Sequence, residues 1–395
     1  MKKFYVLLSA VLFTTAVFAE EPTGISKILP KVSDYSADTD AGFLEAHQPL
    51  LKAPEEGAEK DAKYWAEAVG SRLKVTGYAQ GGYSANLYEG NSSANTNTFD
   101  MKRIILMVGA NITKDFYAFF MHEFKSGNVM EYYMEYRPTK AFNLRLGQSK
   151  IELSMENPMS PTVLEAISPM SQSVGYLCGG DALISNGSGR DMGLMAYGDL
   201  FNNKLRYVVE VINGGQINKN DRNNQKDVIA KLEYRPVPNF RLSVSGQKGY
   251  GCAVEKSAYN PTINVGDTYR KDRYAAGFEW KSKVTGTDYY KNRCAMVRCE
   301  ALGGRDGDVG SFGIYGSTAI PVYKQLDVVA MVDYMNMNTD MKAKQTKFMG
   351  GVQYWIHKKC RLQAQYVYWA KSQAQKDITG CGNYSSILTQ VQVAF

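Results

Sequence analysis

The stretch that decides the fold is the end of the chain, Ser385-Ser-Ile-Leu-Thr-Gln-Val-Gln-Val-Ala-Phe395. Every second residue from Ile387 to Phe395 falls on one mostly apolar face, and the residues between them form a mostly polar face. This period of two predicts a β-strand. Such a strand left bare in a soluble protein would invite aggregation at its edge, whereas a membrane barrel pairs its last strand with its first. The tail therefore favours an outer-membrane β-barrel over an ordinary terminal strand of a soluble sheet.

The other end of the chain has the pattern of a secretory signal peptide. Lys2 and Lys3 precede an almost uncharged apolar run over residues 4–18, and the small residues Val17 and Ala19 are placed for cleavage after Ala19. The run is too short for a stable membrane span, and no later stretch approaches twenty apolar residues, which excludes a helical membrane protein. We expect export to the bacterial outer membrane, with residues 1–19 as the signal peptide.

Composition adds two further constraints. Tyrosine dominates the aromatic residues, with 27 Tyr against 4 Trp. Its apolar ring and polar hydroxyl suit a membrane–water boundary, although a Tyr-rich soluble β-protein or a carbohydrate-binding surface would show the same bias. The formal net charge of +7 is spread along the chain, so we expect no nucleic-acid partner.

Residues 20–70 differ from the rest of the chain, because they are rich in Glu, Lys, Ala and Pro and poor in alternation. Within them, residues 58–71 have the spacing of an amphipathic helix, with Ala62, Trp65 and Val69 on one side. We expect a periplasmic N-terminal extension that is partly helical or plug-like, with a flexible tail as the alternative.

Residues 71–395 alternate in hydrophobicity and are broken by turns, which predicts an all-β domain: a sixteen-stranded antiparallel transmembrane β-barrel. Tight links such as Pro236-Val-Pro-Asn239 alternate with longer ones, as periplasmic turns and outer loops do, although links 126–127 and 303–308 are short exceptions. An even strand number places both ends of the barrel on the periplasmic side. The expected strands are 72–83, 98–111, 115–125, 128–137, 141–150, 190–199, 204–214, 226–235, 239–248, 271–282, 291–302, 309–320, 325–336, 345–357, 360–371 and 384–395.

The alternation within the strands places charged residues on the inner face. In Phe240 to Gln247, apolar Leu242 and Val244 alternate with Arg241 and Ser243. If the apolar face meets lipid, the charged residues must face inward, because a charge at the bilayer midplane costs roughly 2–4 kcal/mol. The charged outer face of a soluble sandwich would alternate in the same way, but it does not account for the signal peptide and the alternating link lengths.

The longest connection, residues 151–189, is too long for a simple hairpin link and too apolar for a solvated tail. It contains Met155, Met159, Val163, Leu164 and Ile167. We expect this segment to fold into the barrel and to form a constriction loop.

With these features, the chain resembles the phosphate-selective porins of Gram-negative outer membranes. The resemblance covers about residues 71–395 and rests on the strand that ends Arg145-Leu-Gly-Gln-Ser-Lys150, the long loop after it, the sixteen strands and the terminal Phe395. It implies a homotrimer of barrels in outer-membrane lipid and lipopolysaccharide, conducting anions past basic residues and a constriction loop. The pore-lining positions that it implies here are Arg145, Lys150, Arg206, Arg241, Arg298 and Arg361.

The loop itself departs from the family's chemistry. Residues 151–189 hold no Lys or Arg, whereas Glu152, Glu156 and Glu165 are present. A phosphate trap needs converging cationic donors. We therefore expect a porin for passive diffusion of small hydrophilic solutes or anions, with a weak anion preference. The alternative is a structural or adhesive barrel whose surface loops bind partners.

The six cysteines and three histidines give little sign of other chemistry. Cys294 and Cys299 lie on one predicted strand, roughly 16 Å apart along it and too far to pair. Cys178, Cys252 and Cys381 fall in predicted outer loops, where an oxidising compartment permits a bridge. The chain lacks a Cys-x-x-Cys spacing and the common hydrolase motifs, so we expect no metal, no cofactor and no enzymatic activity.

Overall fold

The computed structural model describes Gly70 and residues 72–167, 170–181, 183–186, 188–284 and 289–395. The expected signal peptide and almost all of the expected extension at 20–70 lie outside these residues. Within them, sixteen antiparallel strands form one closed barrel, in which the last strand pairs with the first. No helix among the described residues is long and apolar enough to cross a membrane.

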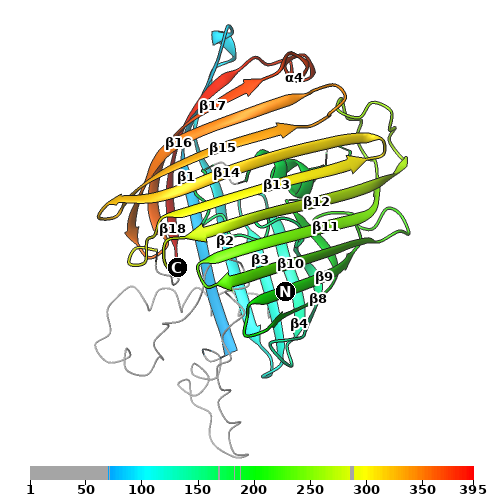
Figure 1. Cartoon of the computed structure of the whole chain (residues 1–395), viewed down its shortest axis with the longest axis vertical. Coiled ribbons are helices and arrows are strands. Elements are labelled where there is room, and N and C mark those ends of the chain that lie inside the picture. The colour runs from blue at the N-terminus through cyan, green and yellow to red at the C-terminus, as the bar shows by residue number, and fades with distance from the viewer. Residues whose placement is uncertain (1–69, 71, 168–169, 182, 187, 285–288) are drawn as a thin grey trace, which may run out of the picture. The chain divides into compact units, whose positions relative to one another are not determined.

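The barrel strands follow one another around the sheet in chain order, as Figure 1 shows. They are β1 (Leu73–Tyr88), β2 (Thr96–Asn111), β3 (Phe116–Glu123), β4 (Asn128–Tyr136), β5 (Asn143–Lys150), β8 (Arg190–Leu200), β9 (Leu205–Ile212), β10 (Asp227–Val237), β11 (Phe240–Cys252), β12 (Thr268–Lys281), β13 (Met296–Asp306), β14 (Val309–Tyr323), β15 (Leu326–Asn336), β16 (Lys344–His357), β17 (Cys360–Lys371) and β18 (Tyr384–Ala394).

Short elements occupy three of the connections. They are η3 (Ser92–Ala94), α3 (Gln172–Val174), the π-helical turn η4 (Gly175–Gly179), the two-residue strands β6 (Gly180–Asp181) and β7 (Ser185–Asn186), and α4 (Gln373–Thr379). Ser372 caps the start of helix α4, where its side chain accepts from the Gln375 amide, and Gly380 caps the end with a φ of 63°. Serine at the start and glycine at the end are the residues that such helix ends favour.

The alternation of side chains decides which face each residue takes. On β10, Ile229, Lys231 and Glu233 are at most 3% exposed, whereas Val228 and Leu232 on the other face are nearly half exposed. The terminal strand divides in the same way, with Ile387, Val391 and Val393 outward and Gln390 and Gln392 buried. The barrel therefore has an apolar outer face and an inner face that carries most of its charge.

The connections divide between two ends of the barrel. One end, here called the short-turn end, holds both ends of the barrel sheet and links that include 112–115, 238–239 and 358–359. The opposite end, the long-loop end, holds 151–189 and 253–267. Each end has exceptions: 307–308 is tight at the long-loop end, and 282–295 is long at the short-turn end.

The prediction for one strand was wrong at both of its ends. The expected strand 291–302 begins only at Met296 and continues to Asp306, because Gly303 and Gly304 belong to the sheet and not to a turn. A side chain on Gly303 would collide with the Tyr274 ring, and one on Gly304 would lie 2.7 Å from Leu177 of the long loop. These two glycines keep the strand in place beside bulky neighbours.

The expectations for the cysteines also need correction. Cys294 precedes β13, so it does not share a strand with Cys299. Cys178 lies in the buried turn η4, and Cys252 is the last residue of β11. All six thiols are free, so the disulfide that the sequence permitted does not form.

Candidate functional site: the barrel interior and its long loop

The connection 151–189, here called the long loop, packs against the inner face of the barrel. Leu153, Met155, Met159, Leu164 and Ile167 are at most 2% exposed. In Figure 1 its helical turn is visible behind β13 and β14. A long link between neighbouring strands that buries its apolar residues must pack on the protein itself, and here the inner wall supplies that surface.

Part of the inner wall is apolar and receives the loop. Leu153, Val174 and Leu177 of the loop cluster with inward residues such as Ile229 and Val329, both 0% exposed. Burial of apolar area stabilises by roughly 25 cal/mol per Å². The apolar contacts therefore contribute to holding the loop on the wall.

Polar groups fix the position of the loop on this wall. The Glu300 carboxylate on β13 accepts from Ser154 Oγ at 2.9 Å and from the Met155 amide at 2.7 Å. The Asp333 carboxylate on β15 accepts from the Gln172 amide at 2.7 Å and pairs with Lys347 at 3.0 Å. Because a buried carboxylate is costly unless it is satisfied, these contacts define one docked position of the loop.

The three loop glutamates that the sequence singled out have different surroundings. Glu152 pairs with Lys231 at 2.7 Å, and Glu165 pairs with Arg298 at 3.1 Å. Glu156 accepts from the Ser171 amide at 2.8 Å and is 2% exposed. Burial raises the pKa of Glu156 to about 7, against the opposing effect of nearby Arg298.

The six basic residues expected to line a pore all lie on inner-face positions, but three of them hold the loop. Lys150 donates to the Met159 carbonyl at 2.6 Å, and Arg361 Nη2 donates to the Leu164 carbonyl at 2.7 Å. Arg298 binds Glu165 as described above. These three side chains are at most 5% exposed, so they are structural partners of the loop.

The other three basic residues pair with carboxylates of the wall. Arg145 binds Glu135 at 2.7 Å, and Arg206 binds Asp199 at 3.1 Å. Arg241 lies 3.2 Å from Glu279 and 3.7 Å from Glu233.

Tyrosine rings lie against two of these arginines. The sequence-based expectations did not include these contacts. Arg145 lies over the rings of Tyr133 and Tyr197, at 4.1 Å and 5.7 Å, and Arg206 lies over Tyr197 at 5.0 Å. Arg137 lies over Tyr117 at 4.1 Å. We call this group on β3, β4, β5, β8 and β9, together with Glu135, Asp199 and Arg137 beside β4, the basic wall. These tyrosines occupy inward-facing positions in the alternation of their strands, and that pattern in the sequence could have predicted the basic wall.

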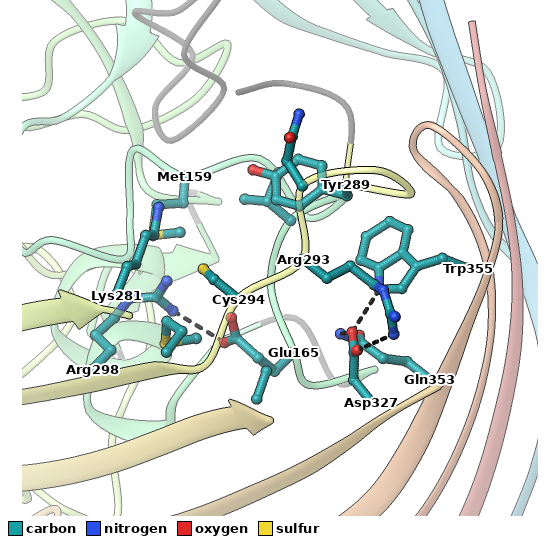
Figure 2. A pocket seen from close by; sticks show the side chains of 14 residues that line it. Met159, Glu165, Lys281, Tyr289, Arg293, Cys294, Arg298, Asp327, Gln353 and Trp355 are labelled. Carbon is teal, nitrogen blue, oxygen red and sulfur yellow. Dashed lines mark hydrogen bonds and ion pairs between the residues drawn. The ribbon is translucent and has the colours of Figure 1, made fainter. Parts of the chain in front are cut away.

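A cavity of about 60 Å³ lies at the short-turn end, on the other side of the interior (Figure 2). The loop contributes Met159 and Glu165, and the connection 282–295 contributes Tyr289 and Arg293. Trp355 of β16 forms part of the strand wall around it. Among the described residues, no group of His, Cys, Asp and Glu has the arrangement to hold a metal ion.

Comparison with known proteins supports the fold and goes no further. No family model matches the chain, and no curated protein matches it. The anion-selective porin from Comamonas acidovorans has a TM-score of 0.59 at 12% identity, over 82% of this chain and 99% of that one. OprB of Pseudomonas putida has a TM-score of 0.62 at 10% identity, over 85% and 96%. The outer membrane channel DcaP of Acinetobacter baumannii has 0.54 at 11%, over 81% and 97%.

Proposed function

We propose that this protein is a channel of the bacterial outer membrane for passive diffusion of small hydrophilic solutes. The observation that carries the proposal is the contrast between the two faces of a closed barrel. Outward residues such as Leu146, Val244 and Tyr366 are about half exposed, whereas charged groups lie inside. An apolar outer belt fits lipid, since a charge there would cost roughly 2–4 kcal/mol, and a charged interior fits water.

The proposal extends to orientation and assembly. The expected signal peptide directs export, and the short-turn end would face the periplasm, as short turns do in bacterial barrels. Lipid and lipopolysaccharide would surround the belt. We propose a homotrimer, on the resemblance to porins that the sequence carries.

The long loop would narrow the channel. Its described hydrogen bonds and ion pairs to the wall join it to β1, to the end of β5 at Lys150, and to strands between β9 and β18, for example at Glu300 and Gln365. The basic wall lies mainly on the strands outside this set. Solute would therefore pass between the loop and the basic wall.

A weak anion preference follows from the basic wall. Its three guanidinium groups, Arg137, Arg145 and Arg206, face the two carboxylates of Glu135 and Asp199. One positive charge is in excess, and guanidinium suits oxyanions because it stays charged and can bind them at two points. A phosphate-specific site is not part of the proposal, since the loop supplies no cation.

A structural or adhesive barrel is the second candidate, and the dense packing of the loop inside the barrel favours it. Liposome swelling separates the two. Vesicles containing the folded full chain should swell in isotonic sugars, faster for small sugars than for large ones. Absence of swelling, with heat-modifiable migration showing that the barrel is folded, would contradict the channel and leave the structural role.

A further inference from the structure

The connection 282–295 is the longest link at the short-turn end, and its described residues Tyr289, Arg293 and Cys294 line the cavity. The Tyr289 ring stacks on Trp355 of β16, with 5.2 Å between centroids and 12° between planes. It also packs against Met159, Val163 and Leu164 of the long loop. Tyr289 therefore bridges the loop and the barrel wall and covers the space between them (Figure 2).

The cavity behind Tyr289 has the size of a small solute. Its volume of about 60 Å³ would hold roughly four or five waters, since one water needs about 10–15 Å³ on this measure. A solute of about five non-hydrogen atoms occupies a similar space. Met296 and Ala319 provide apolar contact on the strand side.

The charges around the cavity are balanced in sign. Arg293 pairs with Asp327 at 2.8 Å, and Arg298 pairs with Glu165 at 3.1 Å and with Glu279 at 2.6 Å. Lys281, the third cation, lies 3.6 Å from Glu279. Asp327 is also held by the indole of Trp355 at 2.7 Å and by the Gln353 amide at 3.0 Å. A ligand that carries only one charge is attracted and repelled to a similar extent in this cavity. A zwitterion can bind a carboxylate and a guanidinium at the same time.

We propose that this cavity binds a small zwitterion of about the size of glycine. Its ammonium group lies between the carboxylates of Glu165 and Asp327, and its carboxylate faces Arg293. Tyr289 is the wall that a ligand must displace to enter from the short-turn end. The proposal rests on the channel function: the cavity lies across the long loop from the proposed path but at the short-turn end, where that path also leaves the barrel, so a ligand held there can impede ions.

Planar-bilayer recording tests the site through the effect of solute on ion current. Glycine added on the short-turn side should reduce the mean open current, and equal concentrations of acetate or methylammonium should reduce it less. Glu165→Gln removes one carboxylate while Arg298 keeps Glu279. This variant should weaken the glycine effect about tenfold, the scale of one charge-assisted hydrogen bond, and should favour acetate over glycine.

Tyr289→Ala is the second variant, with Tyr290→Ala as its matched control. Tyr290 lies in the same connection, but its hydroxyl meets Gln325 and not the cavity. Removing Tyr289 should shorten each glycine block several-fold, whereas Tyr290→Ala should leave the block unchanged. Equal effects of glycine, acetate and methylammonium on a conducting channel would overturn the site. An unchanged block in folded Tyr289→Ala would do the same.

Fluorescence of the folded protein separates failure of the site from failure of the channel. Glycine should change the emission of Trp355, and Trp355→Phe should remove that response. A response without any ion conduction would keep the site and refute the channel. Conduction without a response to glycine in current or emission would keep the channel and refute the site.

Discussion

The charged residues on the two sides of the barrel interior have different partners. Around β9–β18 the wall is partly apolar, and its charged groups, such as Glu300 and Asp333, serve as anchors for the long loop. On the basic wall, arginines lie against tyrosine rings and pair with carboxylates of the same wall, as Arg145 does with Glu135. The difference teaches that an inward charge is not by itself a pore-lining charge. Its partner decides whether it holds the loop or belongs to the basic wall, which the proposed solute path would follow.

Removing the long loop should have the largest effect. Lys150 pairs with Arg190 in register and the Ile151 amide donates to the Gly189 carbonyl at 2.9 Å, so deletion of 155–185 leaves a short link between neighbouring strands. Single-channel conductance should rise several-fold, because the loop no longer fills the lumen. A deletion variant that folds, by heat-modifiable migration, and conducts as before would refute the constriction.

Removing positive charge from the basic wall alone should change the ion selectivity of the channel. Arg145→Gln with Arg206→Gln leaves Glu135 and Asp199 in excess on the basic wall, so the reversal potential under a KCl gradient should move from mild anion to cation preference. Arg241→Gln is the control, because its partners Glu233 and Glu279 keep other cations, at Lys231 and Arg298.

The shift in reversal potential should depend on which arginine is replaced. Charges are screened within about 8 Å at physiological salt, so only groups beside the path should count. If Arg241→Gln moves the reversal potential as much as the double variant does, the two sides are not distinct in the way proposed.

Docking of the loop should depend on pH through Glu156. Its pKa is raised by burial from 4.5 to about 7, so the docked loop favours the protonated carboxyl. The stability that this gives is present below pH 4.5 and is lost as the pH rises through about 7. The loss amounts to roughly 3 kcal/mol for a shift of this size.

Proteolytic sensitivity of the loop measures this effect. Cleavage within the loop should increase from pH 5 to pH 8 in the native protein, and Glu156→Gln should remove most of that dependence. Glu152→Gln is a suitable comparison, since Glu152 forms an ion pair with Lys231 at 2.7 Å. A pH dependence that persists unchanged in Glu156→Gln would contradict the role given to this carboxyl.

A charge introduced on the outer face should have the smallest effect on solute passage. Val244→Arg places a charge on the outer face, 53% exposed, whereas the neighbouring Ser243 is inward and 3% exposed. Stability in a bilayer should fall by about 2–4 kcal/mol if the position lies near the midplane, with little change in ion selectivity. Urea titration in lipid vesicles measures the first quantity. Full stability of Val244→Arg would argue against lipid contact there.

Local pattern predicted most of the barrel. A period of two gave the strand number, the all-β fold and the inward parity of residues such as Arg241, because side-chain direction alternates along any strand. Strand 360–371 was right at both ends, whereas β1 runs five residues beyond the expected 72–83. The error at β13 arose where alternation continued through Cys294 although the chain there folds over the cavity.

The partners of the charged residues could not be predicted in this way. Lys150 and Arg145 lie on one strand with similar surroundings in the sequence, yet one holds the loop and the other belongs to the basic wall. The distinction depends on where residues 151–189 return to the wall. That path is set by packing between segments far apart in the chain, such as Leu164 with Arg361 and Thr162 with Gln392.

Ion conduction by the full chain in a planar bilayer tests the central claim most directly. We predict stepwise currents of uniform size and, under a KCl gradient, a reversal potential of the sign that marks a mild preference for chloride. A folded barrel, inserted in the bilayer, that gives no current steps would contradict the channel. Steps with a clear preference for potassium would contradict the role of the basic wall.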